Sequence, residues 1–210
     1  MSTPKAPNAV VFDLGGVLIR WDPRHLYRQL MPEDEIDAFL DEVGFQAWNH
    51  EQDAGAPWGP AVEEHAALFP HRRELLAAYP ARFAESLDGP VEGTVAILQE
   101  LHAAGTRLVA LTNWSAELFP HAEAAFDFLA LFEGIVVSGR EGVAKPDPAV
   151  FDLLLSRYHL DPARTVFVDD SPANVAAAAA AGFIALAFTG PDRLRADLSR
   201  LGLLDGAGSG

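Results

Sequence analysis

The chain has 210 residues, of which 50% are hydrophobic and 21% charged, the composition of a globular protein with one domain or a core and a modest insert. Its 15 basic and 30 acidic residues give a net charge of −15, which argues against a surface that binds nucleic acid or anionic lipid. The chain has no cysteine, which excludes disulfides, thiol nucleophiles and thiolate metal sites, and its 7 histidines lack the close spacing typical of a zinc site.

Five short apolar runs, rich in β-branched residues, are predicted to form the strands of a core sheet. Each run is nearly continuous in apolar residues, which is typical of a strand that is covered on both faces. In chain order the runs are Ala9–Leu14, Arg107–Asn113, Gly134–Gly139, Thr165–Asp170 and Phe183–Thr189.

The long interval between the first two strands has a different character, because it contains no convincing strand. A crossover helix needs only about a dozen residues, whereas this interval has about 70, so we expect an inserted all-helical subdomain. The predicted organisation is a core of residues 1–20 and 89–210 and a helical cap of residues 21–88. The chain is expected to return to the core through a hinge at Ser86–Pro90.

Helical segments alternate with the later strands. One runs from Pro90 to Gly105, with apolar residues at three-residue steps and a glycine just past its end. Asp147 opens a second helix, and Ser171 opens an alanine-rich third helix. Strands that alternate with helices predict an α/β fold whose parallel sheet has helices on both faces. The last residues, 206–210, are predicted to be a disordered tail.

Polar side chains gather where the predicted strands end. In doubly wound sheets, ligands bind outside the carboxyl ends of the strands. Adjacent carboxylates close to a third one repel each other unless a cation lies among them, and Mg²⁺ prefers such hard oxygen ligands. The sequence therefore predicts a ligand and metal site at this edge of the sheet. Its residues come from the strand ends and from the loop after the third strand: Asp13, Thr112, Asn113, Lys145, Asp169 and Asp170.

Four short motifs carry a resemblance to a known family. They read Val-Phe-Asp-Leu-Gly-Gly-Val-Leu, Leu-Thr-Asn, Lys-Pro-Asp-Pro and Phe-Val-Asp-Asp-Ser-x-x-Asn. In this order and at these strand ends, they resemble the four motifs of the haloacid dehalogenase-like (HAD) hydrolase superfamily, and the resemblance covers the whole chain. It implies a Rossmann-like core with strand order 5-4-1-2-3 and a helical cap over the site, as in the C1 subfamily.

The resemblance also implies catalytic and substrate-binding roles. Asp13 would be the nucleophile that forms an aspartyl-phosphate. Thr112 would bind the phosphoryl oxygens and Asn113 would contact the substrate. Lys145 would steady the charge of both nucleophile and phosphate, and Asp169 would assist from the fourth motif.

A metal site is implied by the same motifs. Asp13, Asp170 and the backbone carbonyl of Gly15 would supply the protein's ligands to Mg²⁺. The metal would neutralise the repulsion between the nucleophile and an incoming phosphate dianion.

The chain departs from the family at Gly15. Most phosphatases of the superfamily have an aspartate there, which acts as general acid and base, although bacterial sugar-phosphate phosphatases similar to this chain also have Asp-Leu-Gly. We therefore expect a preference for leaving groups that need little protonation, such as aryl, acyl or anomeric sugar phosphates, unless water or a cap residue supplies the proton.

The motifs are compatible with three functions. The leading one is a Mg²⁺-dependent phosphomonoester hydrolase, with a sugar phosphate among the candidate substrates. A 2-haloacid dehalogenase would use the same nucleophile, but such enzymes typically lack the paired carboxylates Asp169-Asp170 and have threonine where this chain has Val17. A weakly active binding protein of this fold would have no need to keep the nucleophile Asp13.

Substrate specificity is expected to come from the cap. We expect a small phosphorylated substrate, a monomer or homodimer, and neither nucleic acid nor membrane as a partner. No apolar run approaches a membrane span, and Met1–Asn8 lack the apolar core of a signal peptide, so the predicted location is cytoplasmic. An aromatic and polar cluster, which is either the specificity site or a solvated loop, comprises Trp48, Asn49, His50, Glu51, Gln52, Asp53 and Trp58 around Gly55.

Overall fold

A five-stranded parallel sheet forms the centre of the computed structural model, which describes residues 6–204. The predicted tail, residues 206–210, lies outside the described residues. Among the core strands the order is third, second, first, fourth, fifth, so the predicted order 5-4-1-2-3 is confirmed. The sheet runs β5 (Gly134–Val137), β4 (Arg107–Thr112), β1 (Ala9–Phe12), β6 (Thr165–Asp169) and β7 (Ile184–Ala187).

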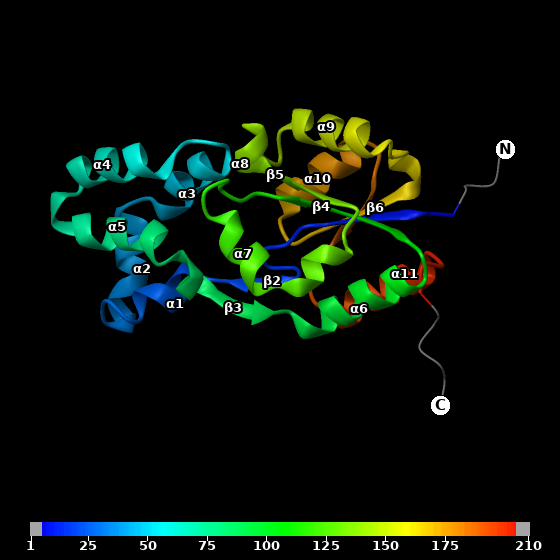
Figure 1. Ribbon diagram of the computed structural model, residues 1–210, viewed down its shortest axis with the longest axis horizontal. Helices are drawn as coiled ribbons and strands as arrows, with labels where there is room; N and C mark the ends of the chain where they lie inside the picture. Colours follow the sequence, from blue (N-terminus) through cyan, green and yellow to red (C-terminus); the bar gives the residue numbers. More distant parts are fainter. Residues whose placement is uncertain (1–5, 205–210) are drawn as a thin grey trace.

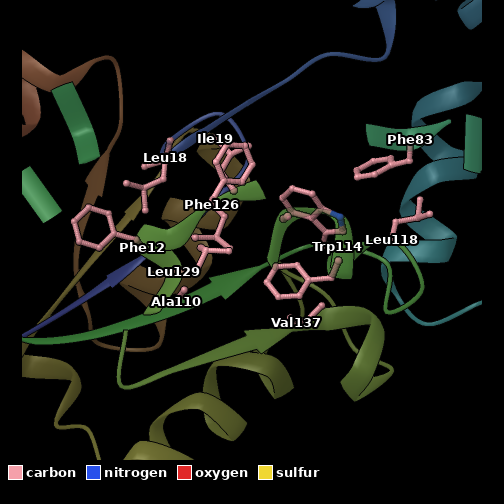
Figure 2. Close-up of a cluster of buried hydrophobic side chains, with 14 of the residues drawn as sticks. Phe12, Leu18, Ile19, Phe83, Ala110, Trp114, Leu118, Phe126, Leu129 and Val137 are labelled. Carbon is pink, nitrogen blue, oxygen red and sulfur yellow. The ribbon is translucent and has the colours of Figure 1, made fainter. Parts of the chain in front are cut away.

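The central strand explains why the apolar runs are continuous. All four residues of β1 are buried and pair with both β4 and β6, so neither edge of the strand is free. Val10 and Phe12 pack into one hydrophobic layer, and Ala9 and Val11 pack into the other. Figure 2 shows part of the first layer, with Phe12 and Leu129 among its labelled side chains. A strand with two buried faces needs apolar residues at every position.

Helices cover both faces of the sheet (Figure 1). The layer of Phe12 is covered by α6 (Glu92–Ala103), α7 (Phe119–Ala125) and α11 (Pro191–Arg200), and the opposite layer by α9 (Pro148–Tyr158) and α10 (Pro172–Ala180). The short helix α8 (Ser138–Glu141) follows β5 directly. Asp147 is the N-cap of α9, as predicted, because its carboxylate accepts a hydrogen bond from the Ala149 amide at 2.9 Å.

Five α-helices between residues 22 and 86 lie together beside one end of the sheet (Figure 1). Their interior is aromatic: the ring centroids of Tyr27 and Phe39 are 4.9 Å apart, and those of Phe45 and Tyr79 are 4.8 Å apart. This insert consists of α1 (Pro23–Tyr27), α2 (Glu33–Glu42), α3 (Phe45–Asp53), α4 (Trp58–Leu68) and α5 (Arg73–Ala81).

A small antiparallel ribbon connects the insert to the sheet. It consists of β2 (Ile19–Trp21) and β3 (Leu87–Pro90), with Ile19 opposite Pro90. The apolar pattern predicts no strand in this interval, but the two strands overlap both of its ends. They are too short for a periodic signal, and the pairing joins residues that are distant in sequence. The side chain of Arg20 reinforces the pairing by donating to the Pro90 carbonyl at 2.6 Å.

Within the described part of the chain, no helix combines the length and the apolar character that crossing a membrane requires.

Candidate active site

A buried lysine lies at the centre of the predicted site. The side chain of Lys145 is fully buried, and its ammonium group lies 2.9 Å from Asp13 and 2.7 Å from Asp169. It also donates to the backbone carbonyl of Leu111 at 2.9 Å. Because a buried ammonium group needs compensating charge, the two aspartates at the ends of β1 and β6 fix its position.

The loop that carries Lys145 is held by Asn113. The Asn113 amide donates to the Lys145 carbonyl, and its carbonyl oxygen accepts from the Lys145 backbone N–H, each at 2.8 Å. The sequence predicts that Asn113 contacts the substrate. In this structure both polar ends of its side chain join the carboxyl end of β4 to the lysine loop. Asn113 also lines the cavity described below, and its contact with a substrate stays a prediction.

Asp169 is fixed from three sides. It pairs with Lys145, accepts from the Ser171 backbone N–H at 2.9 Å and accepts from the Asn174 amide at 3.0 Å. Asn174 is absent from the predicted site residues, although it is the last residue of the Phe-Val-Asp-Asp-Ser-x-x-Asn motif. The first turn of α10 places Asn174 next to Asp169. The spacing of the two residues within the motif is the sequence feature that could have predicted this contact.

Three carboxyl groups converge at the predicted metal position. Asp13, Asp169 and Asp170 each offer an oxygen atom, and these atoms lie within 4.8 Å of one another. Gly16 makes room for them, since a Cβ atom there would lie 2.3 Å from Asp170 Oδ2, and its φ of +73° also favours glycine. This set of hard oxygen donors fits Mg²⁺.

The charge in this cluster is unbalanced, because one ammonium group faces three carboxyl groups. Burial raises the pKa of Asp13 to about 7; the Lys145 charge opposes this shift and the Asp169 charge adds to it. Burial and then the charge of Asp169 also raise the pKa of Asp170. Groups that resist ionisation because of burial and mutual repulsion favour a further cation among them.

Thr112 carries an unused hydrogen-bonding group. Its side chain is buried at the carboxyl end of β4, next to β1, and its hydroxyl has no hydrogen-bond partner. A buried hydroxyl without a partner is unfavourable by about 1–3 kcal/mol, so its presence at a strand end points to a ligand.

A small cavity lies between the sheet and the insert. Its volume is about 60 Å³, enough for a few water molecules but not for a metabolite. The core contributes Gly15, Asn113 and Trp114 to its lining, and the helices α3 and α5 of the insert contribute Asn49, Asp53 and Tyr79. Trp21 of the ribbon and Phe83, which follows α5, complete the lining.

The predicted specificity cluster is only partly at this cavity. Of its members, Asn49 and Asp53 line the cavity, whereas Trp48 and Trp58 belong to the buried aromatic interior. His50 is exposed on the outer surface of α3. Residues 48–53 of the cluster belong to α3, Gly55 lies in the turn that follows, and Asn49 and Asp53 present an amide and a carboxyl group to the site.

The insert is hydrogen-bonded to the core along one seam. Trp58 donates its backbone N–H to Glu117 at 2.9 Å and its indole N–H to the Ser115 hydroxyl at 3.0 Å. The Ser138 hydroxyl donates to the Asp53 carbonyl at 2.5 Å. These contacts fix α3 and the start of α4 against the segments that follow β4 and β5.

The chain is similar to several known proteins. A family model described as haloacid dehalogenase-like hydrolase matches residues 7–182. A sesquiterpene phosphatase of Aspergillus oryzae is 30% identical over 188 residues, which cover 86% of this chain and 89% of that protein. A phosphoglycolate phosphatase of Rhodospirillum rubrum is 33% identical over 190 residues, which cover 84% of this chain and 77% of that protein. The magnesium complex of a HAD family enzyme from Bacteroides thetaiotaomicron shares the fold, with a TM-score of 0.67 at 18% identity over 89% of this chain and 95% of that one.

Proposed function

Because the chain belongs to the haloacid dehalogenase-like hydrolase family, we propose that it is a Mg²⁺-dependent phosphomonoester hydrolase. The observation that carries the proposal is the cluster of Asp13, Lys145, Asp169 and Asp170 beside the unpartnered hydroxyl of Thr112. The similarity to two phosphatases supports it. The substrate is a small phosphorylated metabolite, with sugar phosphates among the candidates.

Asp13 acts as the nucleophile in this proposal. Its carboxylate forms a bond to phosphorus while the bond between phosphorus and the leaving oxygen breaks, which gives an aspartyl-phosphate and an alcohol. Water then hydrolyses the aspartyl-phosphate. Lys145 balances charge on the nucleophile and the phosphate, and the Thr112 hydroxyl donates to a phosphoryl oxygen. Asp169 and Asn113 act by positioning Lys145.

Mg²⁺ is the cofactor, and Asp13, Asp170 and the Gly15 carbonyl are the proposed protein ligands. When bound, the ion supplies positive charge that allows a phosphate dianion to approach a carboxylate. The carboxyl cluster and the glycine at position 16 fit this function.

The function is tested by a screen of phosphorylated metabolites and 2-haloacids, each with and without Mg²⁺. We expect phosphate release from phosphomonoesters only when Mg²⁺ is present, and no halide release. Halide release that persists in EDTA would replace the phosphatase by a metal-independent dehalogenase.

The insert is proposed to be a cap, residues 21–88, that moves against a core of residues 1–20 and 89–210. The support is the small size of the cavity, which is too small for a metabolite while Trp58 of the insert is hydrogen-bonded to the core. Closure then excludes water from the reaction.

Hydrogen exchange can detect this movement. We expect beryllofluoride with Mg²⁺, a phosphate mimic, to slow exchange near Gly15–Trp21 and at Ser86–Pro90, where the ribbon joins the insert to the sheet. Trp58→Phe removes the indole hydrogen bond to Ser115, so it should speed exchange in the ligand-free protein and keep the protection by the mimic. Identical exchange with and without the mimic would contradict a moving cap.

A further inference from the structure

The cavity has open space next to Gly15. A Cβ atom at this position would meet no atom within 4 Å, and Gly15 is not among the glycines with a left-handed backbone. No neighbouring side chain therefore fills the place where a larger residue would stand. A carboxyl group faces the same cavity from the insert: Asp53, at the C-terminal end of α3.

We propose that Asp53 is a catalytic residue, which protonates the leaving oxygen and then activates water for the second step. This inference rests on the proposed phosphatase function. Gly15 has no side chain that could transfer a proton to the leaving oxygen. The inference assigns this proton transfer to a residue of the insert.

The Asp53 side chain is held in place. The Asn49 amide, one helical turn earlier, donates to Asp53 Oδ2 at 2.8 Å. The Ser138 hydroxyl holds the Asp53 backbone carbonyl, so the closed seam also fixes the position of this residue against the core. A general acid must be positioned in this way to reach the leaving oxygen.

The surroundings of Asp53 favour its neutral form. Three aromatic side chains line the same cavity, namely Trp21, Tyr79 and Phe83. Burial raises the pKa of Asp53 to about 7, although a hydrogen bond from the Ser115 backbone and the charge of Lys145 act in the opposite direction. A carboxyl group with such a pKa can donate a proton near neutral pH and accept one back.

The other ionisable group in the cavity lining is less suitable. Burial, followed by the charge of Asp53, raises the pKa of Tyr79 well above its ordinary value, which makes the phenol a weaker acid. The Tyr79 oxygen also accepts a hydrogen bond from the Trp21 indole at 3.2 Å. Among the residues that line the cavity, Asp53 is the one with a carboxyl group.

The proton balance closes over one turnover. As Asp13 bonds to phosphorus, the leaving oxygen takes the bonding electron pair and the proton of Asp53, and the alcohol departs. The Asp53 carboxylate then takes a proton from the water that attacks the aspartyl-phosphate. Inorganic phosphate and free Asp13 are formed, and Asp53 is protonated again.

The test compares Asp53→Asn, which keeps the shape of the side chain but carries no transferable proton, with the unmodified protein. Alkyl phosphates need a protonated leaving group, so their kcat/KM should fall by about 10²–10⁴-fold. For p-nitrophenyl phosphate, whose leaving oxygen needs no proton, kcat/KM should change by less than about tenfold. Its kcat should fall, and rapid mixing should show a burst of p-nitrophenolate because breakdown of the intermediate lacks its base.

Two further variants serve as a rescue and as a control. Gly15→Asp in the Asp53→Asn background should restore part of the alkyl phosphate activity, since the space beside Gly15 is open. Glu64→Gln, an exposed carboxylate on α4 of the same insert, should leave both substrate classes unchanged.

The outcomes separate this inference from the proposed function. If Asp53→Asn lowers kcat/KM equally for alkyl and aryl phosphates, or lowers it for neither, Asp53 does not have this role. Hydrolysis that depends on Asp13 would remain in either case. If the unmodified protein hydrolyses no phosphomonoester, the phosphatase function itself fails. Hydrolysis that is unchanged in Asp13→Asn would instead assign the nucleophile to another residue.

Discussion

Asp13→Asn is expected to eliminate turnover while the fold remains. Removal of a nucleophile typically lowers kcat by about 10⁴-fold or more, and the amide of asparagine cannot form the aspartyl-phosphate. The substitution keeps the size of a side chain that is 10% exposed, and it removes one of the mutually repelling carboxyl groups. Lys145 keeps its contacts with Asp169 and the Leu111 carbonyl, so its ammonium group remains paired.

This first expectation is measured by phosphate release and by acid-quenched mass spectrometry, which should locate a phosphoryl group on Asp13 of the unmodified protein. Asp147→Asn is a matched control, because asparagine is also a good N-cap and Asp147 caps α9. The control should retain its activity. Activity that survives in Asp13→Asn would assign the nucleophile to another residue.

Asp170→Ala is expected to weaken Mg²⁺ binding by more than about 100-fold, since even residues outside the first coordination shell contribute about 10–100-fold to metal affinity. Asp170 adds a carboxyl group to the cluster beside Asp13, and Gly16 leaves space for it. Removal of this group takes away both a ligand and the negative charge that attracts the ion.

Calorimetric titration with Mg²⁺ alone gives a readout that is independent of activity. Asp152→Ala is the control, because it removes an exposed carboxylate from α9 and should bind Mg²⁺ like the unmodified protein. EDTA should stop phosphate release in the same preparation. An unchanged affinity in Asp170→Ala would place the metal away from the carboxyl cluster.

The core of the fold could be predicted from the sequence because its signals are local. The strand β1 consists of four consecutive apolar residues that are buried on both faces, so its pattern stands out without knowledge of its neighbours. The ribbon of β2 and β3 has no such pattern. Its strands have three and four residues, and their pairing depends on a contact between residues far apart in the chain.

Some residues of the candidate site could also be predicted from the sequence, and others could not. Asp13, Lys145, Asp169 and Asp170 could be predicted together, because parallel strands bring their carboxyl ends to one edge of a sheet. The use of the Asn113 amide could not be predicted, since both of its hydrogen bonds go to a loop that follows another strand.

The sequence by itself determined the α/β core, its strand order through the family motifs, and the residues that meet at the carboxyl ends of the strands. These features depend on short apolar runs and on the residues directly after them. Only the tertiary structure decided which insert residues reach the site. Asp53 and His50 lie on the same helix, but Asp53 lines the cavity and His50 is exposed. That difference arises from the packing of α3 against the core at Ser138, a contact between distant segments that no local pattern encodes.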